Sequence, residues 1–155
     1  MIRSKALIAL ALVGVCFLPN GPAVLAGSAA DIPIPDCEIV PLPPDAPPGL
    51  GKLLGEWRGS WQISNLDSTL VVKEILPDQK KAKYLYGWGV CPAYNIMEPG
   101  CSEGEAELVL GKKPQIEFVS ESGARFRFVL KGDKLKGTRK SKGYVARITM
   151  EKAKD

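Results

Sequence analysis

The cysteines have the most specific chemical potential in this chain. Residues 84–101 read YLYGWGVCPAYNIMEPGC, so Cys91 and Cys101 enclose nine residues that include two prolines and a glycine. In an oxidising compartment such thiols pair, and closing so short a loop would contribute roughly 2 to 3 kcal/mol to stability. We therefore predict a Cys91–Cys101 disulfide. Cys37 then stays free, joins two chains, or takes one of the other two cysteines as its partner.

The chain has no histidine among its 155 residues. Ser-His and Cys-His catalysis and histidine zinc sites are therefore excluded. Glu103, Glu105 and Glu107 alternate along a predicted strand, and a charged outer face explains them. We find no spacing typical of a metal site and no other catalytic pattern. The prediction is a protein that is not an enzyme and holds no metal or cofactor.

The N-terminus has the pattern of a bacterial secretory signal peptide. Arg3 and Lys5 precede an apolar run at 6–18, and the small-residue stretch AVLAGSAA follows. The run is too short to span a bilayer. Cleavage after Ala26 or after Ala30 fits, and we assign residues 1–26 to the signal. We expect an exported protein, periplasmic or extracellular, without a transmembrane segment.

Residues 27–50 are predicted to form a proline-rich extended arm. Seven of the thirteen prolines fall between positions 33 and 48, a density that forbids helix and central strand. The arm is either a spacer or a tail that docks into a partner.

Residues 51–155 are predicted to form one all-β domain. Period-two alternation and turn residues recur every ten to twelve positions. The predicted strands are 54–63, 68–76, 80–88, 104–110, 115–120, 124–131, 133–140 and 143–151. Short links between consecutive strands indicate an antiparallel meander, and eight such strands close into an up-and-down β-barrel without exposed edges.

The alternation places most aromatic residues inside this barrel. Nine of the eleven fall on predicted inner faces, the exceptions being Phe17 and Tyr94. Such an interior is either a solid core or the wall of a ligand pocket.

The segment LLGEWRGSW resembles the opening strand of lipocalins and of the avidin group. In these barrels a Gly-x-Trp lies near the closed end, which implies structural roles for Gly55 and Trp57. Arg147 is the loose match for the basic residue that lipocalins stack on this tryptophan. The resemblance implies a barrel that binds a small ligand or a partner.

The plan of the chain is also similar to secreted bacterial inhibitors of metalloproteases. They too combine a signal peptide, an extended arm, an eight-stranded barrel and one disulfide. In them the arm enters the protease cleft. This resemblance implies an inhibitory role for the arm as the alternative function.

Basic and aromatic residues alternate in RFRFVLKGDKLKGTRKSKGYVAR. They fall on opposite faces of the strands, so a single-strand nucleic-acid platform, which needs both on one face, is not predicted. A basic outer face toward an anionic envelope component is the more consistent interpretation.

Together these patterns predict a secreted barrel that binds a small apolar or aromatic-stacking ligand, including a carbohydrate, at its mouth. The loop between Cys91 and Cys101 would act as a lid or as a contact surface. As the alternative, that loop and the arm would bind a protease, another partner or the envelope. The predicted ligand-binding residues are Trp61, Tyr84, Tyr86, Trp88 and Tyr94.

Overall fold

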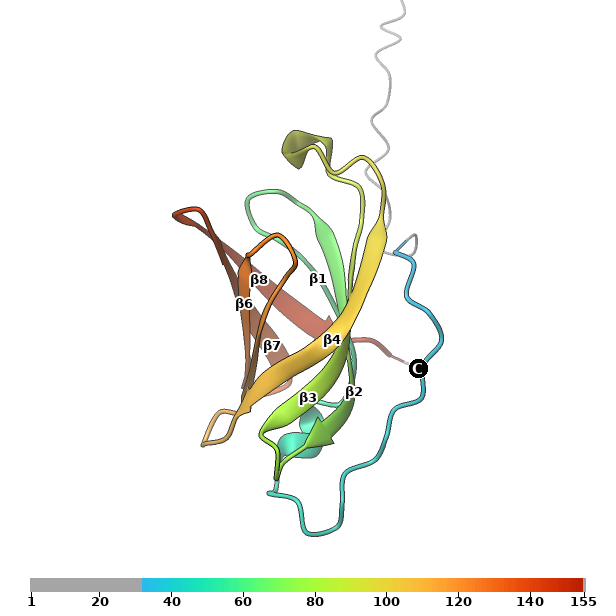
Figure 1. Ribbon diagram of the computed structural model, residues 1–155, viewed down its shortest axis with the longest axis vertical. Helices are drawn as coiled ribbons and strands as arrows, with labels where there is room; N and C mark the ends of the chain where they lie inside the picture. Colours follow the sequence, from blue (N-terminus) through green and yellow to red (C-terminus); the bar gives the residue numbers. More distant parts are fainter. Residues whose placement is uncertain (1–31, 155) are drawn as a thin grey trace, which may run out of the picture.

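The computed structural model describes residues 32–154, which contain eight antiparallel strands closed into a barrel (Figure 1). Each strand pairs with its neighbours in sequence, and β8 returns to β1. The predicted all-β, up-and-down barrel is confirmed. The strands are β1 (Gly55–Ser60), β2 (Asp67–Leu76), β3 (Lys81–Trp88), β4 (Gly100–Val109), β5 (Gln115–Val119), β6 (Arg125–Lys131), β7 (Lys134–Ser141) and β8 (Tyr144–Lys152).

Two strand boundaries differ from the predicted ones by more than two residues. β1 ends at Ser60, because the chain turns at once and the Trp61 amide donates to the carbonyl of Leu66. β4 begins at Gly100, because residues 100–102 pair with 86–88 of β3. This extension brings Cys101 into the barrel wall.

The closed end of the barrel is built around Trp57. The short 3-10 helix η2 (Leu50–Lys52) lies across this end, and the Trp57 indole donates to the Leu53 carbonyl at 2.9 Å. Gly55 starts β1 with φ +102°, in the left-handed region that favours glycine. The ammonium of Lys152 lies 5.5 Å from the Trp57 ring. Lys152, and not Arg147, therefore covers this tryptophan, because Arg147 faces outward on β8.

Side chains fill the barrel from the closed end to about the level of Phe128. The residues here are almost completely shielded from solvent, and the list includes Leu53, Leu70, Leu108, Ile116, Phe128, Leu135 and Met150. Gly137 leaves the room that the Phe128 ring occupies, since a Cβ there would lie 2.5 Å from it. This half of the interior is thus a packed core.

The described part of the arm, residues 32–49, runs along the outside of the barrel (Figure 1). Ile32 is buried, and a Cβ on Gly87 of β3 would overlap its Cγ2 atom. The Val40 amide donates to the Lys73 carbonyl of β2 at 2.8 Å. The arm therefore packs on its own barrel between these two points.

Among residues 32–154, no helix has the length and apolar character needed to cross a membrane. The predicted signal peptide lies outside the described residues.

Candidate functional site

A cavity of about 420 Å³ opens at the end of the barrel opposite η2. The turns after β1, β3, β5 and β7 all lie at this end, which is uppermost in Figure 1. The volume is within the range of small-molecule sites. The cavity is lined by Trp61, Leu66, Tyr86, Trp88, Tyr94, Ile96, Ser102, Phe118, Ser120, Glu121, Ser122, Phe126 and Arg139.

The structure brings four of the five predicted ligand-binding residues to this cavity. They are Trp61, Tyr86, Trp88 and Tyr94. Tyr84 lies outside the lining, and its ring stacks on Phe118 at 4.0 Å between centroids. Tyr84 is two residues further along β3 toward the closed end, where the core is filled.

Aromatic rings packed against one another line part of the cavity. The rings of Phe118 and Phe126 lie 4.9 Å apart at an interplanar angle of 11°, and Tyr86 packs 5.0 Å from Phe126. An aromatic lining of this kind suits an apolar or aromatic ligand, because rings pair with other rings in offset-stacked or edge-to-face arrangements.

Three side chains fix the wall by hydrogen bonds. The Trp61 indole donates to the Tyr86 hydroxyl at 3.0 Å and to the Ser68 hydroxyl at 3.1 Å. The Tyr86 hydroxyl donates to Ser68 at 3.0 Å. Burial raises the pKa of Tyr86 above its ordinary value, so this hydroxyl stays protonated at neutral pH. Trp61 and Tyr86 are therefore held in place before any ligand arrives.

Arg139 brings the one basic side chain into the lining. It is the cross-strand partner of Phe126, and its guanidinium lies 5.9 Å from the centre of that ring. Its Nε atom is buried and has no hydrogen-bond partner. Among residues 32–154, no ion pair involves Arg139. The cavity therefore holds a cation that forms no ion pair, although Glu121 lines the same cavity.

Arg139 is not among the ligand-binding residues predicted from the sequence. The signal was present in the alternation of Leu135, Gly137 and Arg139, which places all three on the inner face of β7. An arginine at the end of an otherwise apolar series is easily counted with the many basic residues of the outer face. Its inward direction follows only when the alternation is continued to the end of the strand.

The loop between β3 and β4, residues 89–99, crosses the rim of the cavity. It contains the 3-10 helix η3 (Pro92–Tyr94) and is closed on itself by the Cys91 amide, which donates to the Ile96 carbonyl at 2.8 Å. Tyr94 and Ile96 line the cavity. The hydroxyls of Tyr94 and Tyr144 lie 2.9 Å apart, which links the loop to β8.

The predicted Cys91–Cys101 disulfide is not formed in this structure. Both thiols are free. Cys91 belongs to the core cluster, and its Sγ donates to the Ser64 carbonyl at 3.4 Å. Cys101 pairs with Gly87 in the register of β3 and β4, next to the pair of Ser102 with the inward Tyr86. The two sulfurs therefore face opposite sides of the barrel wall, because neighbouring residues of a strand alternate in direction.

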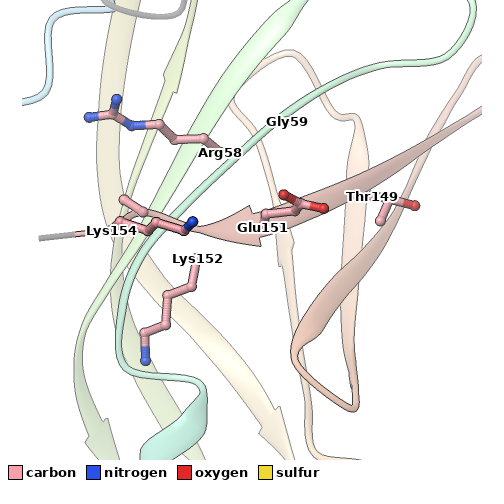
Figure 2. Close-up of a pocket in the computed structure, with 7 residues that line it drawn as sticks. Arg58, Gly59, Thr149, Glu151, Lys152 and Lys154 are labelled. Carbon is pink, nitrogen blue, oxygen red and sulfur yellow. The ribbon is translucent and has the colours of Figure 1, made fainter.

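A second hollow lies on the outer surface where β8 returns to β1. Figure 2 shows that the side chains of Arg58 and Lys152 extend from it in different directions. Arg58 pairs with Glu56, and Glu151 pairs with Lys134 at 2.8 Å. Because these charges are directed elsewhere, the hollow has no convergent set of groups for a ligand.

The acidic residues of β4 lie on the outer face, as expected from their alternation. Glu103 pairs with Lys73, and Glu105 pairs with Lys81. Within residues 32–154, no three His, Cys, Asp or Glu side chains are grouped in a way that could hold a metal ion.

Comparison of the chain with protein-family models, curated proteins and solved structures finds no match.

Proposed function

We propose that the open end of the barrel binds a small ligand with a flat apolar or aromatic body and an anionic group. The observation that carries this proposal is the buried, unpaired Nε of Arg139 within an aromatic cavity of about 420 Å³. A buried polar group without a partner is costly. A carboxylate, sulfonate or similar acceptor would remove that cost.

The two parts of the site have separate roles in this proposal. The rings of Tyr86, Phe118 and Phe126 supply apolar contact that does not depend on the charge of the ligand. Arg139 supplies orientation, because a guanidinium binds an anionic group in a defined geometry. The hydroxyls of Ser102, Ser120 and Ser122 line the same cavity and offer further hydrogen bonds. A sugar acid also fits this chemistry.

Two fluorescent probes with the same aromatic skeleton test both parts. Anilinonaphthalene sulfonate has a negative charge, and phenylnaphthylamine is its neutral counterpart. We expect Arg139→Met to lower the affinity for the sulfonate probe by about tenfold or more, since a hydrogen bond to a charged group contributes about 1.5 to 3 kcal/mol. Its affinity for the neutral probe should stay within about threefold. Trp88→Ala should weaken both probes.

The matched control is Arg147→Met, which removes an outward, exposed guanidinium from β8. It should leave both affinities unchanged. Near-ultraviolet circular dichroism checks that each variant retains native packing, because these probes also bind partly unfolded protein. Equal losses for Arg139→Met and Arg147→Met would contradict the proposal.

A second candidate function rests on the rim of the open end. Apolar side chains are exposed here on turns and at strand ends, among them Ile63, Met97, Val119 and Val145. Exposed apolar clusters mark surfaces that contact other proteins. Native mass spectrometry of the purified protein separates the two functions. A retained small mass supports ligand binding, whereas a retained protein chain favours the contact surface.

A further inference from the structure

The outer face of β2 and β3 is buried although it lies outside the barrel. Thr69, Val71 and Leu85 are each no more than 3 % exposed. Their neighbours Leu70 and Tyr86 point into the core, so these three point outward. Another part of the chain must therefore shield this outward face of β2 and β3 from solvent.

The arm provides this cover. Ile32, Ile34 and Cys37 line the same surface hollow as Thr69 and Val71. A Cβ on Gly87 would lie 2.5 Å from Ile34 Cδ1, so the arm approaches the bare backbone of β3 at this glycine. The Val40 amide then reaches the Lys73 carbonyl. Cys37 lies between these two anchored points.

Cys101 shares this outer face. It is the cross-strand partner of Gly87, and the next outward residue of β4, Glu103, is the partner of Leu85. Lys73 extends from β2 to pair with Glu103 at 3.3 Å, across the outer side of β3. Cys101 therefore lies beside the strip of barrel surface on which Cys37 is held.

We propose that Cys37 and Cys101 form a disulfide that fastens the arm to the outside of the barrel. Cys91 is unsuited to this bond because it lies in the core cluster. The sulfurs are unbonded in this structure, and closure requires a shift of the arm, which lacks strand pairing. The charge of Cys37 also contributes, after burial and Glu103, to raising the pKa of Cys101, as expected for neighbouring thiols.

The bond forms by exchange with a donor disulfide, either glutathione disulfide or an oxidised dithiol oxidoreductase. The thiolate of one cysteine attacks a donor sulfur, and one donor thiol leaves. The second thiolate then attacks the mixed disulfide at the protein sulfur, and the second donor thiol leaves. The protein loses two protons and two electrons, which the donor receives as two thiols.

Peptide mapping tests the pairing in a Cys16→Ser background, which leaves three cysteines. Trypsin alone keeps Cys91 and Cys101 in one peptide, residues 84–112. Cyanogen bromide, which cleaves after Met97, is therefore added to the tryptic digest, so that the three cysteines lie in three separate peptides. In a glutathione redox buffer we expect a fragment that joins Cys37 to Cys101 and disappears on reduction. Cys91 should react with iodoacetamide only after unfolding. A link from Cys91 to either partner would overturn the proposal.

Two further results would also overturn it. One is the persistence of all three thiols in a buffer that reoxidises a reduced control protein. The other concerns Gly87→Ala, whose added Cβ must displace Ile32 and Ile34. We expect this variant to slow closure by about fivefold or more, because it lowers the effective concentration of Cys37 at Cys101. Gly111→Ala is the matched control, since nothing lies within 4 Å of a Cβ there. Equal closure rates for the two variants would contradict docking of the arm.

Discussion

At the scale of the residue, the hydrogen bonds of the polar atoms distinguish the side chains that only shape the aromatic interior from the one that is free to bind a ligand. Trp61 and Tyr86 are hydrogen-bonded to each other and both to the Ser68 hydroxyl, so their polar atoms already have partners within the protein. Arg139 keeps an unsatisfied Nε. The same cavity thus contains fixed groups that shape it and one group that still needs a partner.

A residue-scale prediction follows from Tyr84, whose pKa is raised by burial. The unfolded chain ionises this phenol near its ordinary pKa of 10.0, whereas the folded protein holds the proton to higher pH. The stability that this difference supplies is complete below pH 10 and is lost as pH rises through the folded pKa. In Tyr84→Phe the free energy of unfolding should therefore decrease less steeply with pH above about pH 10 than it does in the wild-type protein.

Urea unfolding between pH 7 and pH 11 measures this slope. At pH 7 the variant should remain close to wild type, since among the hydrogen bonds of the described residues none uses the Tyr84 hydroxyl. An alkaline slope identical to that of the wild-type protein would show that Tyr84 ionises equally in both states.

At the scale of the element, the contact between β1 and β8 is the least regular part of the barrel. Within β1, Trp57 and Arg58 are the residues that pair in register with β8, and Trp61 adds an isolated bridge to Ile148, whereas β2 and β3 share eight pairs. Single hydrogen bonds extend the closure at both ends, from Gln62 to Arg147 and from Ala153 to Glu56. Between them the backbones are close at Gly59, because a Cβ there would lie 2.5 Å from the Thr149 carbonyl oxygen.

Gly59→Ala should accordingly weaken barrel closure. The new methyl meets backbone, which cannot swing away as a side chain can, and we expect a loss of about 1 to 3 kcal/mol in the free energy of unfolding. Equilibrium unfolding in urea measures the change. Gly111→Ala, which adds the same methyl in open space, should change the stability by less than about 0.5 kcal/mol. A Gly59→Ala protein as stable as this control would refute the argument.

At the scale of the whole molecule, the charges are arranged as exposed pairs around a barrel that is apolar inside. The ion pairs of the described residues are Arg58–Glu56, Lys73–Glu103, Lys81–Glu105, Lys83–Glu74, Arg127–Glu117 and Lys134–Glu151. All of them are open to solvent, where water and salt screen their attraction. The fold therefore depends on the packed interior rather than on these pairs.

A whole-molecule prediction tests this distribution. Raising sodium chloride from about 50 mM to 1 M should change the free energy of unfolding by less than about 1 kcal/mol. Urea unfolding at the two salt concentrations gives the difference. A loss of several kcal/mol at high salt would mean that the surface charges hold the barrel together.

Much of the barrel was predictable from the sequence because alternation is a local property. Trp57, Tyr84 and Phe128 were assigned to the inner face from their positions alone, and all three are buried. The charged outer face of β4 was predicted in the same way. Four of the five predicted ligand-binding residues line the cavity because Tyr86 and Trp88 lie toward the open end of β3, Trp61 directly follows β1, and Tyr94 lies in the loop between β3 and β4 at the same end.

The rest could not be predicted because it depends on how strands are staggered around a closed barrel. Tyr84 and Tyr86 share one face, and only the tilt and stagger of the sheet decide that the cavity reaches Tyr86 and not Tyr84. The arm has no periodicity that would indicate which surface it covers. The direction of Cys101 depended on β4 starting four residues earlier than predicted.

The sequence by itself therefore determined the strands, their order and the direction of most side chains, since each of these follows from neighbours along the chain. Only the tertiary structure decided the depth of the cavity, the isolation of Arg139 and the placement of the arm beside Cys101. These depend on contacts between residues far apart in sequence, and such contacts exist only once the barrel has closed.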